Sequence, residues 1–182
     1  MKTRQLTKNQ QIKNGLIYML QVGFRSLLPF ITIPIFTRIL TPKDYGVLAL
    51  AMIYAIIMNG IVNFGLLTVF ERNYFQYRGN PRKLAQLFYS TITFIIINFV
   101  FLYCLTYLFK KNISTFLTGS NQYDILILTA FAAQFFSGTI LNFFLAYFKN
   151  AEKAKTHTKY QIANSLLNMI ISIILVAYVR VG

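Results

Sequence analysis

Five long apolar segments, separated by short polar and basic stretches, dominate the pattern of the chain. Each is about 20 residues or longer, which is the length a helix needs to cross the hydrocarbon core of a bilayer. The pattern therefore predicts an all-α fold, a polytopic transmembrane helix bundle with about five spans. The expected helices cover about residues 15–40, 42–70, 84–109, 123–148 and 160–178, within a transmembrane region of residues 15–180.

The turn between the first two segments is very short. Thr41 is placed to cap the second helix, Pro42 suits its first turn, and Asp44 meets the positive end of the helix dipole. The chain should therefore turn back on itself here and form a membrane hairpin. Because five is an odd number for a fold built from hairpins, we expect a fragment whose next partner is missing. The alternative is a complete five-helix protein.

The basic residues are distributed unequally between the two sides of such a bundle. Residues 1–14 form a basic segment, and twelve of the 18 Lys and Arg residues fall on the same side as this segment, against five on the other. Since cytoplasmic loops are enriched in Lys and Arg, the N-terminus is expected in the cytoplasm. The net charge of +14 does not indicate nucleic-acid binding, because the basic residues lie between apolar segments rather than along one polar face.

Polar residues recur at helical spacing inside every apolar segment. Such stripes must face other helices or water, because unsatisfied polar groups are costly in lipid. Hydrogen bonds between helices would explain single residues, whereas stripes on most helices favour a hydrated central cavity. The stripes include Tyr18, Gln21, Arg25 and Thr32; Asn59 and Asn63; Ser90 and Thr93; Gln134, Gly138 and Asn142; and Gln161, Asn164, Asn168 and Ser172.

Arg25 is the sharpest candidate for a functional group. It lies about ten residues into the first segment, roughly 15 Å along a helix and near the middle of the bilayer. A cation at that depth is costly unless it is paired or hydrated, and the four acidic residues of the chain all lie at segment ends or in loops. Pro29 and Pro34 follow in the same segment, where they interrupt the backbone hydrogen bonds and could form hinges or static bends.

Chemistry typical of enzymes is missing from the sequence. His157, the single histidine, falls in an expected cytoplasmic loop and is interpreted as a solvated residue. No metal-ligand spacing, phosphate-binding loop or nucleophile motif is found, and no carboxylate pair lies within the segments. We therefore expect no cofactor, no metal site and no enzymatic activity.

The stretch around the first turn resembles the N-terminal part of the polysaccharide-biosynthesis flippases, which belong to the multidrug/oligosaccharidyl-lipid/polysaccharide exporter superfamily. The hallmark of these proteins is Arg-x-Leu-Gly-Pro-x-x-Tyr-Gly, with Thr41 here where Gly is usual. Asn63-Phe64-Gly65-Leu66 adds to the likeness, which is specific over about residues 25–80. The structural motif residues are Pro29, Pro34, Arg38, Pro42, Asp44, Tyr45 and Gly46.

The resemblance implies an incomplete first lobe of a two-lobe transporter. It would flip an undecaprenyl-diphosphate-linked oligosaccharide across the bacterial cytoplasmic membrane by alternating access. Its partners would be the lipid bilayer, the anionic lipid-linked glycan, a polysaccharide polymerase and glycosyltransferases. The expected substrate-binding residues are Arg25, Gln21, Arg72 and Lys149, with Arg25 matching the diphosphate oxygens.

Two alternatives to a flippase are open on the sequence. A cation-coupled multidrug exporter of the same superfamily commonly uses an acid within the membrane, which these segments lack. A small membrane subunit that transports nothing would be complete with five helices.

Overall fold

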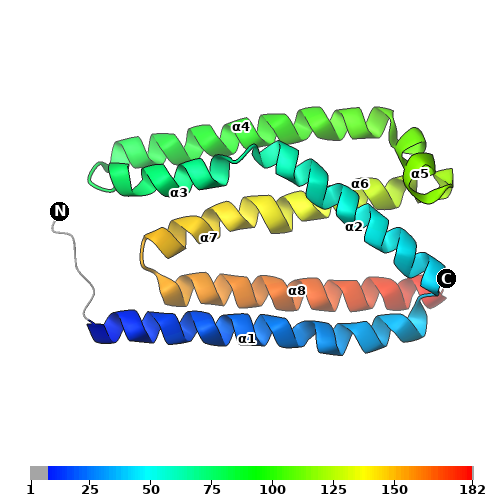
Figure 1. Cartoon of the computed structure of the whole chain (residues 1–182), viewed down its shortest axis with the longest axis horizontal. Helices are drawn as coiled ribbons and strands as arrows, with labels where there is room; N and C mark the ends of the chain where they lie inside the picture. The colour runs from blue at the N-terminus through cyan, green and yellow to red at the C-terminus, as the bar shows by residue number, and fades with distance from the viewer. Residues whose placement is uncertain (1–7, 182) are drawn as a thin grey trace. The chain divides into compact units, whose positions relative to one another are not determined.

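The computed structural model describes residues 8–181, without the side chains of residues 8, 11, 171 and 173–181. All regular structure in this part of the chain is helical, so the predicted all-α bundle is confirmed (Figure 1). The chain forms two compact units, one of residues 1–42 and 148–182 and one of residues 43–147. The helices are α1 (Lys8–Ile39), α2 (Pro42–Asn63), α3 (Leu66–Tyr77), α4 (Pro81–Leu108), α5 (Lys110–Thr118), α6 (Asp124–Gln134), α7 (Leu141–Asn150) and α8 (Ala154–Val181), with the short 3₁₀ turn η1 (Asn121–Tyr123) and the π-helical segment η2 (Phe135–Ile140).

Four helical stretches in the described residues are long and apolar enough to cross a membrane. They are Ile12–Ile39, Pro42–Asn63, Pro81–Leu108 and Asn121–Asn150. The protein is therefore a polytopic helical membrane protein. The fifth predicted span, residues 160–178, falls on α8, and its side chains from residue 173 onward lie outside the described residues.

The first unit is built on α1 and α8, which pack along each other and run in the same direction (Figure 1). α1 begins at Lys8, so residues 8–14 of the predicted basic segment are helical, and residues 1–7 lie outside the described part. α8 begins at Ala154, six residues before the predicted span, and the rings of Tyr160 and Phe148 stack at 5.7 Å. The loop expected before residue 160 is therefore partly helical.

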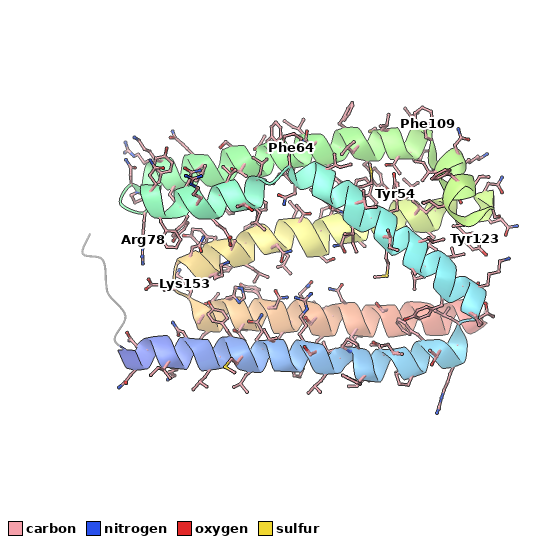
Figure 2. The ribbon with its side chains drawn as sticks, in the orientation of Figure 1. Tyr54, Phe64, Arg78, Phe109, Tyr123 and Lys153 are labelled. Carbon is pink, nitrogen blue, oxygen red and sulfur yellow. The ribbon has the colours of Figure 1, made fainter. Side chains whose placement is uncertain are left out.

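The predicted helix of residues 42–70 is interrupted, which is a correction to the sequence analysis. Phe64 and Gly65 have φ angles of 48° and 73°. Two successive left-handed residues cannot continue a right-handed helix, so α2 ends at Asn63 and α3 begins at Leu66. Figure 2 labels Phe64 at this break, where its side chain is 76% exposed. α3 then packs back against α4, and the residues from Glu71 to Tyr77 are helical rather than part of a loop.

Two further segments differ from the prediction. The polar link expected over residues 110–122 contains helix α5, which ends at Thr118 and is followed by Gly119 with a φ of 72°. The single helix expected over residues 123–148 is divided into α6, η2 and α7. The π-helical segment inserts an extra residue into the turn, a feature that is frequent at functional sites.

Two groups of aromatic side chains form the core of the second unit. The Phe99 cluster joins α4 to α6 and η2, with the rings of Phe99 and Phe135 stacked 3.7 Å apart. The Phe70 cluster joins α3 and α4 to α7, and Phe70 is fully buried. These contacts fix the position of η2 and α7 within the unit. The Phe99 cluster consists of Phe99, Tyr103, Phe131 and Phe135, and the Phe70 cluster of Phe70, Tyr74, Phe88, Phe143, Phe144 and Tyr147.

Candidate functional site

A polar cluster joins α1 to α8 in the first unit. Gln21 on α1 is only 8% exposed, and its Oε1 accepts a hydrogen bond of 2.9 Å from the hydroxyl of Thr158. The same oxygen lies 3.2 Å from Nδ1 of His157, and the edge of the Tyr18 ring contacts the imidazole at 5.2 Å between centroids. Because a carboxamide oxygen only accepts, His157 donates from Nδ1. We call these four residues the Gln21 cluster.

Arg25 lies one turn beyond Gln21 on the same face of α1. On α8, Gln161 follows His157 by four residues and is 8% exposed. Figure 1 shows that the two helices run in the same direction. Because Arg25 and Gln161 each follow by four residues a member of the Gln21–His157 pair, they lie at about the same level along the two helices. The Arg25 side chain itself is exposed, and no acidic residue of the described part forms an ion pair with it.

The backbone next to Arg25 is also unusual. Pro29 lies inside α1 and has no N–H to donate to the carbonyl of Arg25, four residues earlier. The site thus presents a guanidinium and a peptide carbonyl that the proline leaves without its usual helical donor. A guanidinium is suited to bidentate binding of carboxylate or phosphate oxygens.

Three of the four predicted substrate-binding residues lie in the same unit. Gln21 and Arg25 are on α1, and Lys149 is exposed in the last turn of α7, close enough to His157 to influence its pKa. Arg72 is exposed on α3, which belongs to the other unit.

The prediction of a solvated loop residue at His157 is wrong. This residue is half-buried in α8 and bonded to Gln21, not solvated in a loop. The signal was present in its spacing, because His157 precedes Gln161 by four residues and so extends the polar stripe of the last segment by one turn.

Comparison with known families identifies the chain. A family model described as "Polysaccharide biosynthesis protein" matches residues 12–181. The chain belongs to this family. The resemblance drawn from its first turn is thereby confirmed, and the family together with the apolar helices makes it a membrane protein of the transporter type in polysaccharide biosynthesis. No curated protein and no solved structure matches the chain.

The motif residues of this polysaccharide biosynthesis protein lie around the end of α1 and the start of α2. Both Pro29 and Pro34 lie inside α1, where Thr32 and Thr37 donate hydrogen bonds to carbonyls of the preceding turn. The hinge role of the prolines stays a prediction. Arg38 is in the last turn of α1, and the first turn of α2 contains Pro42, Asp44, Tyr45 and Gly46.

The Gln21 cluster is expected to make the stability of this polysaccharide biosynthesis protein depend on pH. Burial, with a smaller contribution from Lys149, lowers the pKa of His157 below its usual 6.5. The unfolded chain therefore binds a proton before the folded one does, so stability is full above about pH 6.5 and falls as the pH drops towards the folded pKa. The thermal unfolding midpoint of the protein in detergent should decrease over this window.

The variant His157→Gln supplies the control for this pH effect. The amide of glutamine can donate to Gln21 but does not titrate. Because His157 is the single histidine of the chain, the midpoint of the variant should be nearly flat across the same window. An equal decrease in both proteins would assign the pH dependence to other groups.

Proposed function

We propose that the protein flips an undecaprenyl-diphosphate-linked oligosaccharide from the inner to the outer leaflet of the bacterial cytoplasmic membrane by alternating access. The observation that carries this proposal is the exposed guanidinium of Arg25 in the middle of a membrane span. The span Ile12–Ile39 extends about 20 Å on either side of Arg25 at the rise of a helix.

The depth of Arg25 has an energetic consequence. An arginine at the centre of a membrane helix costs about 3 kcal/mol or more unless water or an anion compensates it. No described acid provides this compensation. A diphosphate that crosses the membrane needs a cation along its path for the same reason, and the two requirements match. We propose that Arg25 binds the diphosphate at the midpoint of the passage.

The other predicted residues have supporting roles in this proposal. Because the Gln21 oxygen is already engaged by Thr158 and His157, Gln21 is better suited to orient α1 on α8 than to contact the substrate with that atom. Lys149 is an exposed cation in the last turn of α7, whereas Arg72 is exposed in the middle of α3 and not at the helix end expected from the sequence. Both would attract the anionic head of the substrate as it arrives.

The proposed orientation places the N-terminus in the cytoplasm. Twelve of the 18 basic residues would then lie on the cytoplasmic side, in accordance with the enrichment of Lys and Arg in cytoplasmic loops. Glycosyltransferases and a polysaccharide polymerase are the proposed partners, because they would make the lipid-linked glycan and consume it.

The acidic residues favour an anionic substrate over a cationic drug. Of the four in the chain, Asp44 and Asp124 lie in first turns of helices, Glu71 is in α3 and Glu152 lies between α7 and α8. None lies in the span Ile12–Ile39 that carries Arg25, so a positively charged cargo would meet a fixed cation there without an acid on the same helix to hold it.

Depletion of the protein in its own cell tests the proposed function. Lipid-linked oligosaccharide should accumulate in the inner leaflet, measured as glycan that a glycosidase or lectin can reach only in inverted membrane vesicles. Expression of the wild-type chain from a second locus should reverse the accumulation. Normal surface polysaccharide together with an unchanged distribution between leaflets would reject the proposal.

A further inference from the structure

A small polar pocket lies inside the second unit, away from the residues discussed so far. It is lined by residues of α2, α3, α6, η2 and α7, and it has a volume of about 170 Å³. At about 30 Å³ for each water, it would hold roughly five or six water molecules. Its polar walls are the side chains of Asn59, Asn63, Gln134, Thr139 and Asn142, and no acidic or basic residue lines it.

The base of the pocket is held rigidly by Asn59. This side chain is 6% exposed, and its amide nitrogen donates a hydrogen bond of 2.8 Å to the carbonyl of Ala55 and one of 3.5 Å to the carbonyl of Phe131. Its oxygen accepts a 3.1 Å hydrogen bond from the hydroxyl of Thr139, in η2. Asn59 therefore ties α2 to the π-helical segment and has no hydrogen-bonding capacity to spare on its nitrogen.

The wall opposite α2 depends on a glycine in η2. A Cβ added to Gly138 would lie 2.8 Å from the amide nitrogen of Gln134, closer than real Cβ atoms approach a nitrogen. The Gln134 side chain therefore lies across Gly138, in space that other residues would fill. The stacking of Phe135 on Phe99 fixes η2 in place, so this arrangement belongs to the folded unit.

Three amide groups at the pocket have hydrogen-bonding capacity that the protein does not use. The side-chain amides of Gln134 and Asn142 form no hydrogen bond with another described residue. Asn63 uses its oxygen to accept from the backbone N–H of Leu67, which leaves its amide nitrogen unused. A carboxamide offers two donors and an acceptor, so the pocket presents both kinds of group at close range.

We propose that this amide pocket binds a neutral sugar unit through its hydroxyl groups. A hydroxyl both donates and accepts, as the carboxamides do, and the ligand should be uncharged because the pocket has no charge to compensate. The volume of the pocket suits one sugar ring rather than a chain of several sugars. The choice of a sugar rests on the proposed function, which makes a glycan the cargo. The pocket itself does not depend on Arg25, because its residues belong to the second unit and Arg25 belongs to the first.

A hard cation is the main competitor for the same pocket. Carboxamide and backbone oxygens can coordinate such an ion, but its sites in proteins usually include a carboxylate. The absence of any acidic side chain among the described lining residues favours the sugar.

Saturation-transfer NMR on the full chain in lipid nanodiscs tests the proposal. The probes are glucose, galactose and N-acetylglucosamine, each at millimolar concentration and with potassium as the cation. At least one of these sugars should show saturation transfer from the protein, and an excess of a competing sugar should reduce that transfer. Asn142→Leu removes one amide from the wall and should weaken this binding about tenfold. Gln86→Leu, which changes an exposed amide on α4, should leave it unchanged.

Gly138→Ala provides a second variant that keeps every polar side chain. The three atoms nearest to the added methyl group all belong to the flexible side chain of Gln134, so the fold should persist while that amide is displaced from the pocket. Sugar binding should fall by a factor similar to that of Asn142→Leu. Gly15→Ala, where nothing lies within 4 Å of the new Cβ, is the matched control.

The outcomes separate this inference from the proposed function. Loss of transfer in both pocket variants, with the controls unchanged, supports a sugar site whatever the export assay shows. Transfer that is absent, or equal in all proteins, overturns the sugar site. In a parallel sample with sodium in place of potassium, a bound ²³Na signal that depends on Asn142, without sugar transfer, would also overturn it in favour of an ion site.

Discussion

Replacement of Arg25 by alanine is expected to reduce glycan export by about two orders of magnitude, while insertion into the membrane persists. A hundredfold loss corresponds to about 2.7 kcal/mol, within the range for removal of one partner from a desolvated, charge-assisted pair. The reason is the position of Arg25 midway along a 28-residue span, whose other basic residues, Lys13 and Arg38, lie at its two ends and could not replace its charge. Export is measured as surface polysaccharide after the chromosomal codon is changed.

Two further variants define what the guanidinium contributes. Arg25→Lys keeps the charge but loses the planar fork that binds two phosphate oxygens at once, so it should restore only part of the export. Arg82→Ala removes an exposed arginine from the first turn of α4 and should export normally. Normal export by Arg25→Ala, with the protein present at wild-type amounts, would remove Arg25 from the substrate path.

Replacement of Phe70 by alanine is expected to destabilise the protein by about 3–5 kcal/mol. Phe70 is fully buried, and its ring lies within 5.6–6.1 Å of the rings of Phe88, Phe143 and Tyr74. The substitution would leave a cavity where α3, α4 and α7 meet, which close packing makes costly. The measurement is the thermal midpoint of the purified protein in detergent, followed by size-exclusion chromatography after heating.

Phe116 is the matched control for this prediction. It lies in α5 and is 89% exposed, so Phe116→Ala removes the same ring from a place where it packs against little. Its thermal midpoint should remain near that of the wild type. If the two variants lost stability equally, the Phe70 cluster would not be the core of the second unit.

The features that depend on amino-acid composition and on the spacing of apolar and polar residues were predicted correctly from the sequence. The apolar segments marked the long helices, and the motif at Pro42 marked the start of α2. The stripes of Asn59 with Asn63, and of Gln134, Gly138 and Asn142, indicated polar faces, and these residues line the amide pocket. In each case the spacing along one helix was sufficient, because residues four apart share a face.

The features that the sequence did not predict depend on backbone geometry or on contacts between distant segments. Phe64 adopts a positive φ, which its residue type disfavours. Gly65 beside it is a usual residue at helix ends, but the apolar run continues past it to Phe70 and hides this sign. The π-helical segment is fixed by the stacking of Phe135 on Phe99, 36 residues earlier in the chain. The hydrogen bond from His157 to Gln21 likewise joins residues that lie 136 positions apart.

The central claim is that Arg25 faces water along the path of an anion, and a thiol at its position tests this most directly. Cys104 is exposed and would be changed to serine first. Arg25→Cys is then compared with Leu27→Cys, which lies almost at the same depth but on the opposite face of α1. Both are treated in membranes with a charged, membrane-impermeant thiosulfonate. We expect the thiol at position 25 to react about a hundredfold faster than that at position 27. Equal and slow reaction of the two positions, with modification only by a lipid-soluble maleimide, would contradict the account.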